Sequence, residues 1–254
     1  MMAFDISFPL TRGVVTELLE LISVPSTNSY ATAHDHVLPD FSLVMTTDQT
    51  KGRGRLGRNW IARPGEMLAL SYVVPPKLVP HISWLPLVAA ASLAHALRAV
   101  GIEGVSLKWP NDVLVQGLKL AGVLCEVTRG NRVIVGLGMN LTFPRETPPS
   151  PLATALAHHQ ESSESVLDEV VAGWVTGIRN WLDGDESSAV ETSRKLVTPV
   201  MGTLGRNVIV EEPSGDTWEG VAENLDPSGH LMVRQNDSHI LRRVVASDIT
   251  HLRQ

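Results

Sequence analysis

The apolar pattern of the chain changes near residue 200, and this change limits what the chain can fold into. Before that point, runs typical of buried strands alternate with longer segments of helical spacing. After it, four short strand patterns at 206–211, 217–225, 229–235 and 239–245 are separated by turn-forming residues. Even spacing with such residues at each break is typical of a small all-β barrel. We therefore predict one domain over 1–199 and a second over 200–254.

Helix and strand patterns can be placed within the first domain. Apolar residues at helical spacing predict helices over 12–22 and 84–100, and a further helix with an apolar stripe from Leu167 to Trp181. Apolar runs predict strands over 42–47, 67–74, 105–109, 112–116, 119–127 and 132–141. Gly117-Leu118 joins two of these strands, which predicts a β-hairpin with glycine at the first turn position.

The composition of the 254 residues excludes several classes of protein. With 43% hydrophobic residues and a net charge of −6, the chain can bury a sizeable core, so disorder as its main state is excluded. The negative charge argues against nucleic-acid binding through bulk positive charge, and such binding would need a local patch. The single Cys125 cannot form an intramolecular disulfide, and no Cys and His cluster has zinc-finger spacing.

Two further features concern location. The N-terminus has no basic region leading into an apolar stretch, so a signal peptide is not indicated. The most apolar long segment, 85–102, contains Pro86, Ser92, His95 and Arg98, which favours a packed helix over a membrane span. We expect a cytoplasmic protein without membrane contact.

The most unusual segment is a loop rich in glycine and arginine, Gly52-Arg53-Gly54-Arg55-Leu56-Gly57-Arg58. Its three glycines let the backbone approach a ligand closely, and its three arginines concentrate positive charge. Such a loop suits phosphates or carboxylates. A solvated basic turn and direct nucleic-acid contact are the alternative interpretations.

Other polar segments are less informative when each is taken alone. Lys108-Trp109-Pro110-Asn111-Asp112 reads as a turn, and Lys119 begins the partner strand of the predicted hairpin, where it can lie close to Asp112. Ser26-Thr27-Asn28 reads as a helix N-cap cluster. Gly136-Leu137-Gly138-Met139-Asn140 lacks the third glycine of the dinucleotide fingerprint, and the chain has no P-loop motif.

Taken in chain order, these segments resemble the biotin protein ligase family. The resemblance rests on Ser26-Thr27-Asn28, residues 49–58, Lys108-Trp109-Pro110-Asn111-Asp112, residues 119–126 and residues 136–140. It covers essentially the whole chain, and residues 246–253 look like the family's final strand. Only 25 residues precede Ser26, too few for the helix-turn-helix of repressor-type members, so the chain resembles the ligase-only form and no DNA partner is expected.

The resemblance implies a fold, a reaction and partners. The fold is α+β, a mixed sheet with helices related to class II aminoacyl-tRNA synthetases, followed by an SH3-like barrel. The reaction joins biotin and ATP into biotinyl-5′-AMP and then transfers biotin to a lysine of a biotin carboxyl carrier protein. Mg²⁺ accompanies the triphosphate. The sequence leaves the oligomeric state open.

The resemblance also implies roles for individual residues. The implied biotin site contains Ser26, Thr27, Asn28, Gln49, Arg53, Gly54, Arg55, Lys119 and Gly122. The implied ATP and adenylate site contains Arg53, Arg55, Arg58, Trp60, Asn111, Lys119 and Asn140. Lys119, Arg55 and Asp112 are the implied catalytic residues, with Asp112 orienting the incoming lysine amine. No residue is assigned to a metal.

Two alternative functions remain at this stage. One is a lipoate–protein ligase on a related scaffold, against which the Gly/Arg loop and the Lys-Trp-Pro-Asn-Asp run argue. The other is a nucleic-acid-binding regulator that uses the basic loop, against which the net charge of −6 argues.

Overall fold

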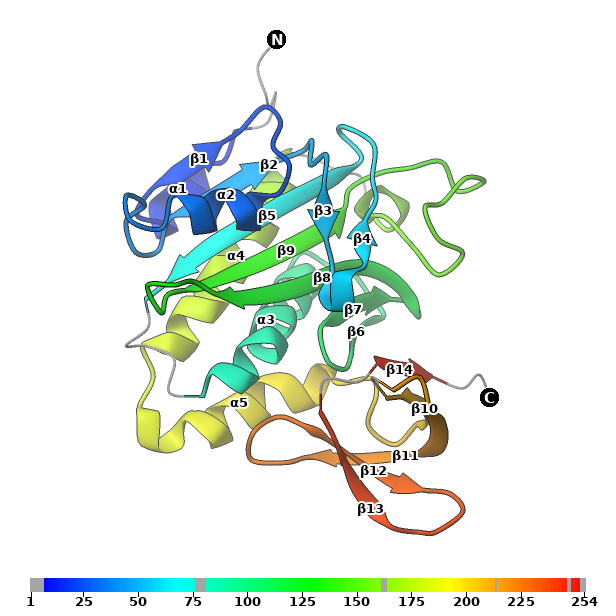
Figure 1. The fold of residues 1–254 in the computed structure, drawn as a ribbon. Helices are drawn as coiled ribbons and strands as arrows, with labels where there is room; N and C mark the ends of the chain where they lie inside the picture. The colour runs from blue at the N-terminus through cyan, green and yellow to red at the C-terminus, as the bar shows by residue number, and fades with distance from the viewer. Residues whose placement is uncertain (1–6, 76–80, 161–163, 213, 246–247, 252–254) are drawn as a thin grey trace.

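A computed structural model describes residues 7–75, 81–160, 164–212, 214–245 and 248–251 (Figure 1). Its largest element is a seven-stranded sheet in the order β1-β2-β5-β9-β8-β7-β6. These strands are β1 (Leu18–Glu20), β2 (Leu43–Thr46), β5 (Met67–Val74), β6 (Val105–Lys108), β7 (Asp112–Val115), β8 (Leu118–Val127) and β9 (Val133–Asn140). The sheet is mixed, because β1 pairs with β2 in parallel and the other neighbours are antiparallel.

Helices cover both faces of this sheet unequally. α3 (Leu85–Ala99) and α4 (Glu164–Leu182) lie together behind it in Figure 1, joined by α5 (Ala189–Val197). α1 (Pro9–Val14) packs on α4, where the Asp168 carboxylate accepts the backbone N–H groups of Leu10 and Thr11. α2 (Thr27–Ala33) and the two-stranded hairpin of β3 (Gly52–Arg53) and β4 (Asn59–Trp60) lie on the opposite face. Short 3₁₀ turns are η1 (Arg55–Gly57), η3 (Ile82–Trp84), η4 (Leu156–His158), η5 (Glu186–Ser188) and η6 (Thr198–Val200).

The sequence-based assignments hold for the long elements. Strand 67–74 is confirmed as β5, helix 84–100 as α3 and the Leu167 to Trp181 stripe as α4. By length and composition alone, Ile82–Ala99 is apolar enough to cross a membrane, but 67% of that segment is buried inside the protein. It packs between the sheet and α4, as a core helix does.

Two local predictions are wrong. Residues 12–22 are not one helix: α1 ends at Val14, and 18–20 form β1. Leu18 and Leu19 pack into separate cores on opposite faces of the sheet, so pairing with β2 overrides the local helical spacing. The hairpin turn is Gln116-Gly117 rather than Gly117-Leu118, since Val115 pairs with Leu118. Both turn residues have positive φ, 51° and 80°, as a type I′ turn requires.

A second sheet follows residue 200. Its antiparallel order is β13-β12-β11-β10-β14, built from β10 (Asn207–Glu211), β11 (Thr217–Leu225), β12 (Leu231–Gln235), β13 (Leu241–Val244) and β14 (Asp248–His251). The four strands predicted from turn spacing are therefore confirmed. Apolar residues of this sheet, such as Val208 and Leu231, belong to the same buried cluster as α3 and α4, so the two sheets share a continuous core.

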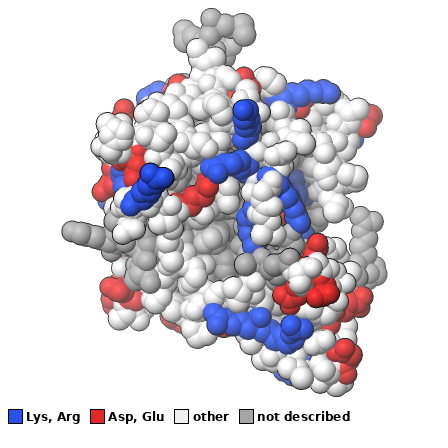
Figure 2. All heavy atoms as spheres, viewed as in Figure 1, with Lys and Arg blue, Asp and Glu red and all other residues white. Residues whose placement is uncertain are grey.

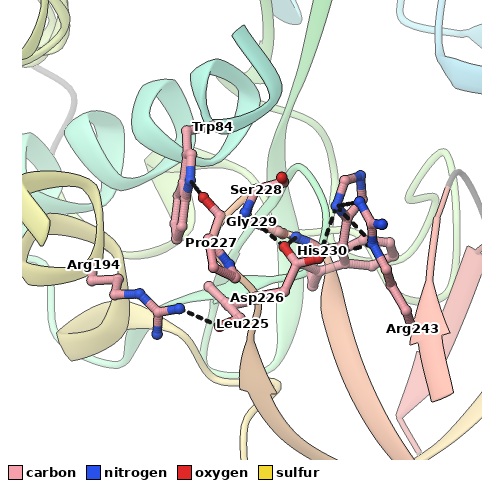
Figure 3. Close-up of polar contacts among 10 residues, drawn as sticks. Trp84, Arg194, Leu225, Asp226, Pro227, Ser228, Gly229, His230 and Arg243 are labelled. Carbon is pink, nitrogen blue, oxygen red and sulfur yellow. Dashed lines mark hydrogen bonds and ion pairs between the residues drawn. The ribbon is translucent and has the colours of Figure 1, made fainter. Parts of the chain in front are cut away.

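Polar contacts also join the second sheet to the helices (Figure 3). The turn between β11 and β12 lies against the start of α3, where the indole Nε1 of Trp84 donates to Pro227 O at 2.8 Å. Arg194 of α5 donates to Leu225 O at 2.7 Å. Asp226 holds the turn in shape by accepting the backbone N–H groups of Ser228 and His230. The turn is thus held by its own hydrogen bonds and by those from Trp84 and Arg194.

Candidate functional site

Two adjoining cavities, of about 240 Å³ and about 880 Å³, lie where the seven-stranded sheet, the β3–β4 hairpin and the second sheet meet. The smaller is lined by thirteen of the sequence-predicted site residues: Ser26, Thr27, Asn28, Gln49, Arg53, Gly54, Arg55, Arg58, Trp60, Asn111, Asp112, Lys119 and Gly122. The remaining one, Asn140, lines the larger cavity. Arg58, Trp60, Asp112 and Lys119 border both. The structure therefore brings together segments that are far apart in the sequence.

Two glycines of β9, Gly136 and Gly138, line the smaller cavity, and the contacts around them explain why glycine stands at these positions. A Cβ atom on Gly136 would lie 2.3 Å from Asn28 Oδ1, and a Cβ on Gly138 would lie 2.9 Å from the Trp60 indole ring. Residues 136 and 138 point to the same face of the sheet. That face must lack side chains there because α2 and the hairpin pack directly on it.

The side chain of Asn28 is held by the sheet. Its Nδ2 donates to Leu124 O at 3.1 Å and to Glu126 Oε2 at 2.7 Å, and its Oδ1 accepts from Ser71 Oγ at 2.6 Å. These contacts anchor the first turn of α2 above β5 and β8. The side chain is 5% exposed with all three of these bonds made, so its main effect is to position the segment that lines the cavity.

Ser26 and Gln49 fix the same segment from the other side. Ser26 is the N-cap of α2, and its side chain accepts the Ser29 N–H, so the predicted capping role is confirmed. Gln49 Oε1 accepts the Thr27 N–H at 2.9 Å. Gly52 leaves room for Gln49, since a Cβ there would lie 2.7 Å from Gln49 Nε2.

Lys119 and Asp112 form an ion pair at the boundary of the two cavities. Lys119 Nζ lies 2.7 Å from Asp112 Oδ1 and 5.5 Å from the centre of the Trp60 ring. Gly122 lies opposite Asp112 in the strand register, and a Cβ on it would lie 3.4 Å from both partners of the pair. The register shift between Val113 and Leu114 brings Lys119 toward Asp112.

The β3–β4 hairpin carries the Gly/Arg loop over the floor. Arg53 Nη2 forms an ion pair with Glu126 Oε2 at 2.9 Å, and Arg55 and Arg58 line the smaller cavity. Figure 2 shows Lys and Arg side chains gathered over this hairpin. Leu56, at its tip, is 61% exposed and adopts φ 54°, in the left-handed region. The loop is therefore neither a detached turn nor part of the core.

The two predicted adenylate residues with amide side chains bind backbone in this structure. Asn111 Nδ2 donates to Val123 O at 2.7 Å. Asn140 Nδ2 donates to Thr154 O at 2.9 Å and makes a longer contact of 3.5 Å with Lys119 O. These bonds set the positions of the β8 backbone and of the segment after β9.

Sequence reasoning missed the contribution of the second sheet. Arg206, Thr250 and His251 line the larger cavity, and Glu211, Ile249 and Thr250 line the smaller one. Lys108 borders both cavities and stood inside a recognised motif, but no role was assigned to it. No local pattern marks Arg206, because only the packing of the two sheets brings it to the cavity.

His251 lines the larger cavity, and its pKa reflects the burial and the charges on that side of the cavity. Burial, with the nearby cations Lys108 and Arg206, lowers the pKa of His251 to about 4. The ring is therefore neutral at physiological pH, and its Nε2 lies 2.9 Å from Thr203 Oγ1. That hydroxyl also accepts the Trp109 N–H at 2.9 Å, so it links the His251 ring to the turn that begins at Trp109.

The described residues contain no cluster of three or more His, Cys, Asp and Glu side chains suited to a metal ion. Among the described residues that line the two cavities, the carboxylates are Asp112, which is paired with Lys119, and Glu211. This donor set fits a cation that arrives bound to phosphates better than a cation caged by protein ligands.

Comparison with known proteins identifies the family. Residues 20–140 match the model of the biotin/lipoate A/B protein ligase family. The chain is 33% identical to a biotin–[acetyl-CoA-carboxylase] ligase of Mycobacterium tuberculosis over 225 residues, which span 84% of this chain and 80% of that protein. It is also 30% identical to the bifunctional ligase/repressor BirA of Bacillus spizizenii. That match covers 96% of this chain and 77% of the Bacillus protein.

A solved structure agrees with these relatives. The fold is similar to that of the Aquifex aeolicus biotin protein ligase in complex with biotin and ATP, with a TM-score of 0.77, 27% identity, and coverage of 93% of this chain and 100% of that one. The chain belongs to the biotin/lipoate protein ligase family.

Proposed function

We propose that the protein is an ATP-dependent biotin protein ligase that forms biotinyl-5′-AMP and then biotinylates a lysine of a carboxyl carrier protein. The observation that carries the proposal is the convergence of the thirteen predicted residues on one cavity. The family relatives named for biotin ligation support biotin over lipoate as the substrate. Arginines that line a cavity, and a net charge of −6, do not favour a nucleic-acid regulator.

The smaller cavity suits biotin. The segment Ser26, Thr27 and Asn28, with Gln49, presents backbone and short polar side chains at one end for the ureido ring. Gly122 and the β9 glycines line this cavity, so their backbone can approach the body of the ligand. Arg53, Gly54 and Arg55 of the hairpin close over biotin and the adenylate, where Arg55 and Lys119 meet the carboxylate.

The larger cavity suits the nucleotide. Arg58 and Lys119 line it and supply positive charge for the phosphates. Trp60 lines both cavities and offers an aromatic ring between them. Asn111 and Asn140 support the adenylate by fixing the backbone around it. Both substrates then meet at Lys119. This lysine borders both cavities and pairs with Asp112.

Adenylation at this boundary needs no enzyme nucleophile. A biotin carboxylate oxygen forms a bond to the α-phosphorus of ATP, the bond from that phosphorus to the bridging oxygen breaks, and pyrophosphate leaves with the electron pair. Lys119 and Arg55 stabilise the oxygens on which charge develops. Mg²⁺ bound to the triphosphate neutralises part of its charge.

Transfer to the carrier uses the same boundary. The uncharged ε-amine of the acceptor lysine attacks the carbonyl carbon of the mixed anhydride, an amide forms, and AMP leaves with the electron pair of the broken bond. Asp112 lies beside Lys119, where its carboxylate orients the incoming amine and takes up its proton.

The finer structural assignments are also part of the proposal. The seven-stranded sheet with its helices corresponds to a class II aminoacyl-tRNA synthetase-like catalytic domain over 1–199. The five-stranded sheet corresponds to an SH3-like barrel over 200–254, and a cytoplasmic location suits an ATP-dependent enzyme. The order and antiparallel pairing of β10 to β14 support the barrel assignment.

A pyrophosphate exchange assay tests the function directly. With Mg²⁺, purified protein should catalyse ATP–pyrophosphate exchange that depends on biotin, because adenylation is reversible. Parallel reactions with lipoate and with neither acid are the controls. Exchange with lipoate but not with biotin would overturn the assignment.

A second expected result concerns the Gly/Arg loop. The hairpin has two residue pairs, its tip is exposed, and Trp60 Nε1 is buried without an acceptor among the described residues, so we expect the loop to open more readily when no ligand is bound. Trypsin should cut first after Lys51, Arg53, Arg55 or Arg58, and biotin with ATP should suppress that cut. Equal cleavage rates with and without ligands would favour a solvated turn.

A further inference from the structure

The larger cavity collects positive charge from three parts of the chain. Lys108 and Lys119 reach it from the seven-stranded sheet, Arg58 from the hairpin. Arg206 reaches it from the turn before β10. Among the described residues that line it, Asp112 is the one carboxylate, and Lys119 already neutralises it. The described residues that line this cavity therefore include more cationic than anionic side chains, in a chain whose net charge is −6.

Arg206 differs from the other arginines of the second sheet in its partners. Arg234, Arg242 and Arg243 form ion pairs with Glu223, Glu212 and Asp226 at 2.6, 3.3 and 2.8 Å. Arg206 donates from Nε to Gly202 O at 2.8 Å, and no carboxylate of the described residues pairs with it. Its terminal N–H groups are therefore available to an anion in the cavity that it lines.

The backbone next to Arg206 is held firmly against the seven-stranded sheet. The Gly202 N–H donates to Leu107 O at 2.8 Å, and a Cβ on Gly202 would lie 3.0 Å from Ser106 Cβ. The Nε bond to Gly202 then ties the guanidinium to this contact. The backbone next to Arg206 is thus fixed relative to β6, which ends at Lys108, and Lys108, Arg206 and His251 all line the larger cavity.

We propose that Arg206, together with Lys108, binds the pyrophosphate portion of ATP, so that the second sheet takes part directly in adenylate formation. This inference rests on the proposed ligase function. Pyrophosphate leaves with the electron pair of the broken phosphorus–oxygen bond, and a planar guanidinium with parallel N–H groups matches its oxygens. Lys119 and Arg55 act at the α-phosphate, and Arg206 acts on the leaving group beyond it.

Kinetics of Arg206→Ala separate the two half-reactions. Losing a charge-assisted contact should raise the KM for ATP, and the KM for pyrophosphate in exchange, by about tenfold to a hundredfold. Transfer of biotin from preformed biotinyl-5′-AMP should keep its wild-type rate, because that substrate carries no pyrophosphate. Arg234→Ala, which removes a paired arginine from the same sheet, is the matched control and should change neither half-reaction.

His251 supplies a readout that does not depend on turnover. Inorganic pyrophosphate bound between Lys108 and Arg206 should offset their charge, so the pKa of His251 followed by NMR should rise. In Arg206→Ala the pKa should already be higher without ligand, and pyrophosphate should move it less. A His251→Gln variant assigns the resonance.

The possible outcomes are distinct. An unchanged KM for ATP and for pyrophosphate in folded Arg206→Ala overturns the inference, as does equal slowing of both half-reactions, which indicates a structural role. Absence of biotin-dependent exchange in the wild-type protein contradicts the proposed function itself, whatever the variant does.

Discussion

Lys119→Ala should slow the formation of biotinyl-5′-AMP by roughly a hundredfold to a thousandfold. Lys119 borders both cavities, and the proposed function places the biotin carboxylate and the α-phosphate there. Removing one preorganised donor from developing negative charge typically costs about 2.7–4 kcal/mol of transition-state stabilisation. The substitution also leaves Asp112 without its cation, and the added negative charge repels both substrates.

Single-turnover measurements with saturating biotin and ATP give the adenylation rate without a contribution from product release. Lys195→Ala is the matched control, because Lys195 is an exposed lysine of α5 that pairs with Glu191. Asp112→Asn removes the negative charge of the Asp112–Lys119 pair but keeps the shape of the side chain. It should slow adenylation less than it slows transfer of biotin to the carrier. A near-normal adenylation rate in folded Lys119→Ala would remove Lys119 from the catalytic residues.

Much of the fold could be predicted because many elements have strong local signals. β5 is a continuous apolar run and α3 has clear helical spacing, so tertiary contacts reinforce what each segment prefers. The strands after residue 200 were marked by turn residues at regular intervals. β1 could not be predicted, because its three residues become a strand through pairing with β2.

The same distinction between local sequence signals and tertiary contacts applies to the candidate site. Residues within recognisable segments, such as the Gly/Arg loop and Lys119, could be predicted as site residues, and in the structure they line one cavity. The reason for the glycines at 136 and 138 needed coordinates, since it lies in contacts with Asn28 and Trp60. Arg206 has no local signal at all, because its place in the cavity depends on how two sheets pack.

Trp109→Ala should lower the free energy of unfolding by about 3–5 kcal/mol, the usual cost of removing a buried aromatic side chain. Trp109 is 4% exposed, and its indole Nε1 donates to Gly229 O at 3.1 Å. Its backbone N–H donates to Thr203 Oγ1 at 2.9 Å. The ring therefore joins the turn that carries Asp112 to the second sheet.

Chemical denaturation measures the stability, and two variants show how the loss arises. Trp109→Phe keeps an aromatic ring but leaves Gly229 O without its donor, so it should cost less, about 1–3 kcal/mol. Trp218→Ala, which removes a partly buried indole of β11 that bonds Glu212, should cost less than Trp109→Ala. Under conditions where Trp109→Ala stays folded, adenylation should also slow, because the turn that positions Asp112 beside Lys119 loses its anchor. An unfolding midpoint equal to that of the wild type would mean that the second sheet is held without Trp109, and that the turn is positioned by the seven-stranded sheet alone.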